Sequence, residues 1–254
     1  MPAENELGDW FRSIPVVTRW WFSLSVVFTL LGRFGVLNVM YMFLNFDLVV
    51  YKFQFWRLFT CIVFYPLSPQ TGFHYLINLY FLYSYSRRLE SGLFDGRPAD
   101  HLFMLIFNCI ILIIIGFLVN LFFLMDPLVL SVLYVWCQIN RDMIVQFWFG
   151  MQFKAMYLPW VLAIFNMVVG GGGMKEILGI FVGHLYFFLM FKYPQDFGGA
   201  RFLSTPGILY KLLPNRRGGV SGFGMPPASR RATDDGNAGG GRHAWGQGRR
   251  LDDD

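Results

Sequence analysis

The chain has 254 residues, of which 55% are hydrophobic and only 15% are charged. A soluble domain ordinarily carries about 25% charged residues, so this composition excludes a water-exposed globule and predicts an all-α membrane protein. The net charge of +5 arises almost entirely outside the apolar stretches. We therefore expect no nucleic-acid partner, and we expect neither a cofactor nor a metal.

The first segment, residues 1–19, is predicted to be cytosolic. Its opening nine residues contain three acidic residues and no basic one, which is the wrong charge for the beginning of a signal peptide. The first apolar stretch is therefore expected to stay in the protein as a membrane span.

Charged residues interrupt the apolar sequence and so mark the candidate spans. A helix needs about 20 residues to cross a hydrocarbon core of about 30 Å. Six spans are predicted, at residues 20–37, 72–86, 102–125, 127–140, 155–174 and 177–191. The fourth and sixth have only 14 and 15 residues and taken alone could be buried or re-entrant helices. Both are counted as spans because the orientation must alternate, and their shortness favours local thinning of the bilayer.

The distribution of Lys and Arg gives the orientation. With six spans and a cytosolic N-terminus, 17 of these residues fall on the cytosolic side and three on the luminal side. Since positive residues concentrate on the cytosolic side, both termini are predicted to be cytosolic. The membrane domain is then 20–191 and the cytosolic tail is 192–254.

The long luminal loop between the first two spans, residues 38–71, is rich in aromatic residues rather than polar ones. Aromatic rings concentrate at headgroup depth, so this loop is expected to lie in the membrane interface. Its Trp56-Arg57 pair would fix it there, with the arginine on lipid phosphate.

Five residues inside the spans point to helix packing or to chemistry. Gly179 and Gly183 form a GxxxG on one face of the last span, which permits close approach of a neighbouring helix. His74 and Asn78 lie one turn apart on the second span. These two residues, with His184, are intramembrane polar groups that form either a functional site or ordinary interhelical hydrogen bonds.

The Trp-Arg pair, the GxxxG and His74-x-x-x-Asn78 resemble the rhomboid superfamily. The resemblance implies a six-helix rhomboid-like bundle, in which proteolysis requires a serine in the fourth span and a histidine before the GxxxG. Leu130 and Glu176 stand at these positions. Because leucine cannot act as a nucleophile, the chain is expected to be a pseudoprotease with no catalytic residue.

A more specific resemblance, to the derlins of the endoplasmic reticulum, covers nearly the whole chain. It is closest to the first derlin of animals. The stretches that carry it are residues 9–15, 78–83, 88–100, 140–143, 183–189 and 202–206. The resemblance implies a multi-pass protein of the endoplasmic-reticulum membrane that moves misfolded proteins to ubiquitin-dependent degradation, with a ubiquitin ligase complex as partner and a homo-oligomer as its assembly.

The tail is rich in Gly, Pro, Arg and Ser beyond residue 198, and a segment with so few apolar residues is expected to be disordered. Near its end stands a short linear motif. It consists of Trp245, Gly246, Gly248, Arg249, Arg250 and Leu251. This motif resembles the one with which derlins bind the hexameric segregase AAA ATPase, the valosin-containing protein, although here the aromatic directly precedes the first glycine.

Two rival functions remain open from the sequence. An active intramembrane serine protease is disfavoured by the replaced catalytic positions. An ion channel or transporter ordinarily needs several ionisable residues within its spans, and His74 and His184 are the clear candidates.

Overall fold

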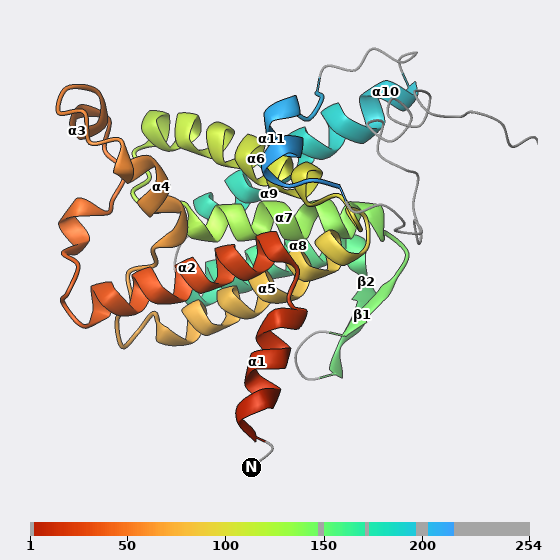
Figure 1. Cartoon of the computed structure of the whole chain (residues 1–254), viewed down its shortest axis with the longest axis horizontal. Coiled ribbons are helices and arrows are strands. Elements are labelled where there is room, and N and C mark those ends of the chain that lie inside the picture. The colour runs from red at the N-terminus through yellow and green to blue at the C-terminus, as the bar shows by residue number, and fades with distance from the viewer. Residues whose placement is uncertain (1–2, 147–149, 171–172, 197–202, 216–254) are drawn as a thin grey trace, which may run out of the picture.

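A helix occupies each of the six stretches in which the sequence predicted a span. The computed structural model describes residues 3–146, 150–170, 173–196 and 203–215. Its six main helices are α2 (Val16–Arg33), α5 (Gly72–Ser91), α6 (Pro98–Val119), α7 (Met125–Ile139), α8 (Leu158–Gly170) and α9 (Met174–Phe187). They run broadly along one direction, as Figure 1 shows, and form a bundle around α7.

Length and apolarity mark two helices as candidate spans among the described residues. These are α6 and the continuous helix Met174–Asp196, which joins α9 to the π-helical turn η4 (Phe188–Lys192) and α10 (Tyr193–Asp196). The helices in the fourth and fifth predicted spans are apolar but shorter. The fold is thus helical with apolar membrane-type helices, and the number of six spans stays a prediction.

The predicted helix boundaries were wrong by several residues, and local chemistry explains the shifts. The helix in the first predicted span, α2, begins at Val16, directly after Pro15. It stops at Arg33, because Gly35 takes a positive φ of 75°. The second continues to Ser91. The third ends at Val119, where Asn120 adopts a left-handed conformation that breaks the helix.

Two expectations about regular structure need correction. The domain is not purely helical, because β1 (Ile144–Gln146) and β2 (Gln152–Lys154) pair as an antiparallel hairpin between α7 and α8. The tail is not irregular throughout its described part, because α11 (Gly207–Leu212) forms and lies against α6. It is held there by Thr205 Oγ1 and Tyr210 Oη, which donate to buried Asp100 Oδ1 at 2.6 and 2.7 Å.

The two ends of the bundle differ. Figure 1 places the hairpin and α10 at one end and the short helix α3 (Phe46–Val50) at the other, while the N-terminal helix α1 (Ala3–Ser13) projects from the side of the bundle. The predicted interfacial loop also contains the turn η1 (Val39–Tyr41) and the helix α4 (Trp56–Val63). Most of its exposed large hydrophobic side chains are aromatic, namely Tyr41, Phe46, Tyr51, Phe53, Phe55, Trp56 and Phe59, and the others are Met40 and Val50.

Arg57 does not lie where lipid phosphate could reach it, contrary to our expectation. Arg57 is only 2% exposed. Its Nε donates to Gln54 Oε1 at 2.7 Å and its Nη1 to the Phe43 carbonyl at 2.9 Å, and the guanidinium lies over the Phe43 ring at 4.8 Å. Arg57 therefore connects two parts of the same loop, whereas Trp56 is half exposed at the surface.

This geometry predicts that Arg57→Lys destabilises the loop. Lysine cannot donate along two directions and stack on Phe43 as the planar guanidinium does. Hydrogen bonds to charged groups contribute roughly 1.5–3 kcal/mol, so we expect a loss near 2 kcal/mol and faster proteolytic cleavage within residues 38–71. Arg33→Lys, at an exposed arginine, is the control and should melt like the wild type.

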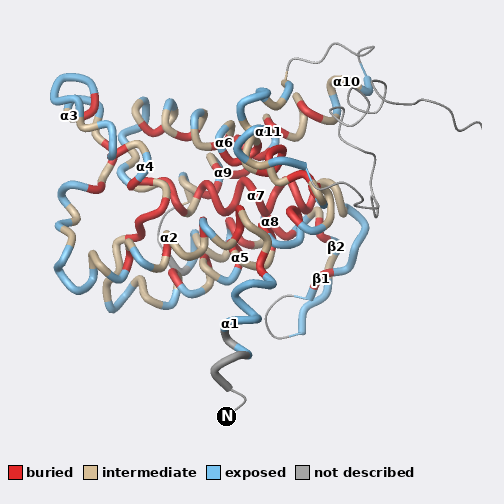
Figure 2. Tube along the Cα trace, viewed as in Figure 1, coloured by how far each residue is buried: buried red, intermediate tan, exposed pale blue. Residues whose placement is uncertain are grey.

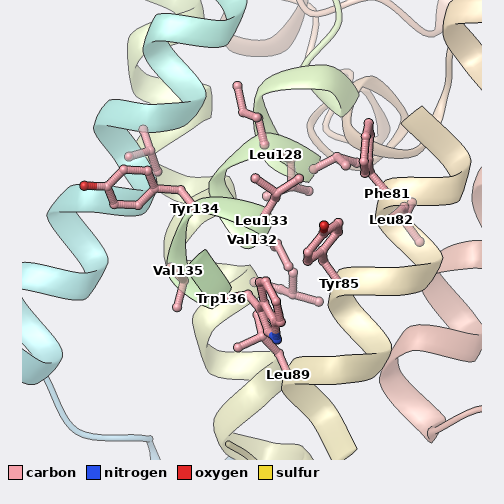
Figure 3. Packing of buried hydrophobic residues seen from close by; sticks show 14 of the residues in the cluster. Phe81, Leu82, Tyr85, Leu89, Leu128, Val132, Leu133, Tyr134, Val135 and Trp136 are labelled. Carbon is pink, nitrogen blue, oxygen red and sulfur yellow. The ribbon is translucent and has the colours of Figure 1, made fainter. Parts of the chain in front are cut away.

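The core is centred on α7. Figure 2 shows the buried residues concentrated along this helix, whereas α1, α3 and the hairpin are largely exposed. In the close view of Figure 3, Val132 and Trp136 of α7 face Tyr85 and Leu89 of α5, and Tyr134 points the other way, toward α9. Because it is covered on both sides, α7 positions the polar groups that its neighbours present.

Candidate functional site

A small polar pocket lies where α5, α7, α8 and α9 meet. Its volume is about 20 Å³, which is enough for a single water molecule or one small hydrogen-bonding group. The polar side chains that line it are His74, Asn78, Asp126, Asn166 and Glu176, and the apolar ones include Phe81, Val129, Leu130, Leu133 and Leu162. The structure thus brings together four residues singled out from the sequence, His74, Asn78, Leu130 and Glu176.

Asp126, in the first turn of α7, joins three helices by polar contacts. Its Oδ1 accepts a hydrogen bond from Asn78 Nδ2 at 2.8 Å, and its Oδ2 pairs with Lys175 Nζ at 3.4 Å. A carboxylate in an apolar bundle is costly unless it is paired. Asn78 and Lys175 supply the pairing that offsets the cost of placing Asp126 in the lining of the pocket.

Glu176 provides the pocket with an open acceptor. The residue is 6% exposed, and its Oε1 accepts from Asn166 Nδ2 at 3.2 Å. Its Oε2 is buried and has no hydrogen-bond partner among the described residues. Buried polar atoms are nearly always paired, so this oxygen marks the place where a donor entering the pocket would bind.

His74 connects the pocket to the interfacial loop. Its Nδ1 lies 2.9 Å from the hydroxyl of Tyr65, and the two rings stack with centroids 6.0 Å apart. His74 shares a helix face with Asn78, as the spacing predicted, but the two side chains bind different partners. Of the two interpretations of this pair, the structure shows the interhelical hydrogen bond for Asn78.

The described lining of the pocket contains no side-chain hydroxyl or thiol. Leu130 stands in the pocket, and the adjacent Ser131 is fully buried. The Ser131 hydroxyl donates to the Leu128 carbonyl at 2.7 Å and accepts from Asn108 Nδ2 at 3.1 Å. Both contacts are made away from Glu176, and a serine needs an adjacent base and an accessible hydroxyl to attack a carbonyl. The described pocket therefore presents groups that can bind a polar group, and the serine beside it is already engaged in other contacts.

Gly179 and Gly183 lie against α7 at backbone contact. A Cβ on Gly179 would meet the Pro127 carbonyl oxygen at 2.6 Å, and one on Gly183 would meet the Ser131 carbonyl oxygen at 2.6 Å. The α7–α9 pairing is the most extensive helix contact in the described fold. It sets Leu130 of α7 against Glu176 of α9 across the pocket.

The third of the predicted intramembrane polar residues, His184, lies elsewhere. His184 is exposed on α9, with its Nδ1 at 2.8 Å from the Tyr134 hydroxyl, and it does not line the pocket. The tail motif, formed by Trp245, Gly246, Gly248, Arg249, Arg250 and Leu251, lies outside the described residues.

Sequence reasoning missed Asp126, Asn166 and Lys175. The signal for Asn166 was available, because an amide inside an apolar span is a candidate site residue. Asp126 and Lys175 were interpreted as span ends. Only the bundle shows that the ends of α7 and α9 face the same pocket as Asn78.

A second buried polar network, also missed, lies at the opposite end of α5. Glu90 accepts from the backbone N–H groups of Val17 and Thr18 at 2.9 and 2.8 Å and from the Thr18 hydroxyl at 2.7 Å. It therefore caps the first turn of α2 from another helix. The Ser86 hydroxyl contacts both Thr18 Oγ1, at 2.8 Å, and His101 Nε2, at 3.1 Å. Ser86 and His101 are fully buried, so this serine–histidine contact is closed to a substrate.

These observations define a helical membrane protein with a central polar pocket whose described lining has no side-chain hydroxyl or thiol. The model of the Der1-like family matches residues 14–207. The chain is 59% identical to Derlin-1 of Mus musculus over 249 residues, covering 98% of this chain and 99% of that protein. It is 54% identical to Derlin-1 of Caenorhabditis elegans over 85% of this chain and 88% of that protein, and 45% identical to Derlin-1 of Drosophila melanogaster over 89% and 91%. The chain belongs to the Der1-like family, and the resemblance to derlins found in the sequence is confirmed.

Proposed function

We propose that the chain is a non-proteolytic factor of endoplasmic-reticulum-associated degradation that moves misfolded proteins through the membrane to the cytosol. Membership of the Der1-like family supports this role. The observation that carries it is the pocket itself, a polar cradle whose described lining has no side-chain hydroxyl or thiol and includes Leu130 and Glu176, the residues that the rhomboid resemblance aligns with the protease serine and histidine. Such a cradle can bind a polar group of a passing polypeptide without cleaving it.

The short helices support a role for local membrane thinning. α7 has 15 residues and α8 has 13, which correspond to about 22 and 20 Å of helix. The hydrocarbon core is about 30 Å thick. A bilayer that adapts to these helices becomes thinner around them, which would lower the cost of bringing a polar substrate segment into the membrane.

The proposed orientation places both termini in the cytosol, with six spans and the tail beside the segregase ATPase. In this arrangement the Trp245–Leu251 motif binds the ATPase, which supplies the work of extraction. A ubiquitin ligase complex supplies the modified substrate, and several copies of the chain assemble in the membrane.

The proposed role of the tail motif predicts that the chain binds the segregase ATPase through its last residues. A chain that ends at Gly241 should bind no segregase ATPase from a detergent extract and should fail to restore turnover of a misfolded substrate in cells lacking their own derlin. A matched control that lacks only residues 252–254 should bind and restore turnover like the full chain. Equal ATPase binding by the chain ending at Gly241 would remove the motif from the mechanism.

The pocket predicts no serine-hydrolase chemistry. The purified chain should not react with a fluorophosphonate probe, because Leu130 offers no hydroxyl and Ser131 is buried. An active rhomboid protease in the same detergent serves as the positive control. Covalent labelling, mapped to a serine of this chain by mass spectrometry, would favour the protease alternative.

A further inference from the structure

A large apolar groove lies between α2 and α6 and shares no lining residue with the polar pocket. Its volume is about 660 Å³, within the range of sites that hold small organic ligands. Trp20 and Leu24 of α2 and Leu105 and Ile106 of α6 are among the side chains that line it. Almost none of its surface is polar, so it offers no partner to the backbone of an unfolded polypeptide.

The groove is only one leaflet deep. It runs along α2 from Val16 to Leu24 and along α6 from Leu102 to Ile110, which is about 12 Å of helix in each case. Beyond this depth α4 closes it, because α4 packs on the second half of α2, where the Phe28 and Phe59 rings lie 6.2 Å apart. A complete transmembrane helix needs about 30 Å of groove, whereas a single acyl chain reaches about half that depth.

The open end of the groove adjoins a second, polar pocket of about 380 Å³. Val16 lines both cavities. The polar pocket contains Arg12 and Arg19, for which no carboxylate lies within ion-pair distance among the described residues. It also contains Glu90, whose oxygens are occupied by the first turn of α2, and the exposed Asp95. The pocket therefore offers two cations for a phosphate and one available carboxylate for an ammonium group.

We propose that the groove and the polar pocket together bind one zwitterionic glycerophospholipid. An acyl chain lies between α2 and α6, the phosphate pairs with Arg12 and Arg19, and the headgroup amine faces Asp95. Three neighbours shape the site: α1 beside the headgroup, α4 at the inner end, and α11 through Leu212 and Leu213 at the mouth. Since α11 is fixed by Asp100, the start of the tail forms part of the wall of the lipid site.

The test is lipid retention by the purified full-length chain, measured by native mass spectrometry and by titration with palmitoyl-oleoyl phosphatidylethanolamine. The wild type should retain one such lipid. Arg19→Gln should weaken binding on the order of tenfold, the effect of losing one charge-assisted contact, and Arg33→Gln at the other end of α2 should not. Ile106→Trp, which fills the groove, should abolish retention, and Ile114→Trp, two turns further along α6 and outside the groove, should not.

Headgroup specificity provides the second arm. Diacylglycerol, which lacks the phosphate, and phosphatidylglycerol, which lacks the amine, should both bind more weakly than phosphatidylethanolamine. Asp95→Asn should remove the difference between the two phospholipids. Retention of lipid by Ile106→Trp, equal affinity for diacylglycerol, or loss of a dimer rather than of lipid in Ile106→Trp would overturn the proposal; the last result would place a second copy of the chain in the groove.

Discussion

Gly183→Leu is expected to abolish folding of the membrane domain. A side chain at this position would meet the Ser131 carbonyl oxygen at 2.6 Å and the Tyr134 Cβ at 2.9 Å, and neither the backbone nor a Cβ can rotate away. Overpacking typically costs about 1–3 kcal/mol. A clash between two helix backbones separates them along their length, so we expect a loss above that range. The measurement is monodispersity and thermal melting in detergent.

The control for this variant is Gly72→Leu. Gly72 is also helical, begins α5, and has no atom within 4 Å of a Cβ built on it. We expect Gly72→Leu to melt like the wild type, because leucine has the higher helix propensity and meets no neighbour. Equal melting of Gly183→Leu and the wild type, with unchanged substrate turnover, would show that α9 does not need close approach to α7.

Glu90→Gln is expected to produce the second largest loss of stability. The wild-type carboxylate accepts three hydrogen bonds from the first turn of α2. A glutamine amide has a single oxygen, and its NH₂ group would face an N–H donor of Val17 or Thr18. Each buried donor left without a partner costs about 1–3 kcal/mol, so we expect a loss of roughly 3 kcal/mol. For a domain of this size the corresponding decrease in Tm is roughly 6–12 °C.

Asp142→Asn is the matched control for Glu90→Gln. It makes the same change of carboxylate to amide in an exposed pair with Lys154, and exposed pairs contribute little to stability. The Tm of Asp142→Asn should stay close to that of the wild type. If Glu90→Gln also left the Tm unchanged, the cap on α2 would carry no net free energy, and the junction between α2 and α5 would depend on apolar packing alone.

The position of the helices was largely predictable, and their ends were not. Apolar runs between charges located all six main helices, because hydrophobic stretches of this length must be buried or face lipid. The ends depended on single residues whose effect is conformational. Gly35 and Asn120 end α2 and α6 through positive φ angles. Helix α5 continues past Arg88, because the guanidinium of Arg88 lies over the Trp136 ring at 5.2 Å. The prediction from charge alone therefore ended α5 too early.

The candidate site was predicted only in part. The spacing of His74 and Asn78 was visible in the sequence, and the rhomboid resemblance singled out Leu130 and Glu176. Their common pocket depends on how closely α7 and α9 pack at Gly179 and Gly183. The partners Asp126, Asn166 and Lys175 come from other helices, and no spacing along the chain relates them.

The sequence by itself determined the class of protein, the family resemblance and the location of the helices, because these depend on composition, apolar length and the identity of single residues. The tertiary structure decided which polar groups meet, where Glu90 and Arg57 find their partners, and that α2 and α6 leave an apolar groove. The physical reason is that pairing of buried charges and the shape of cavities depend on distances between helices, and those distances follow from packing rather than from the order of residues along the chain.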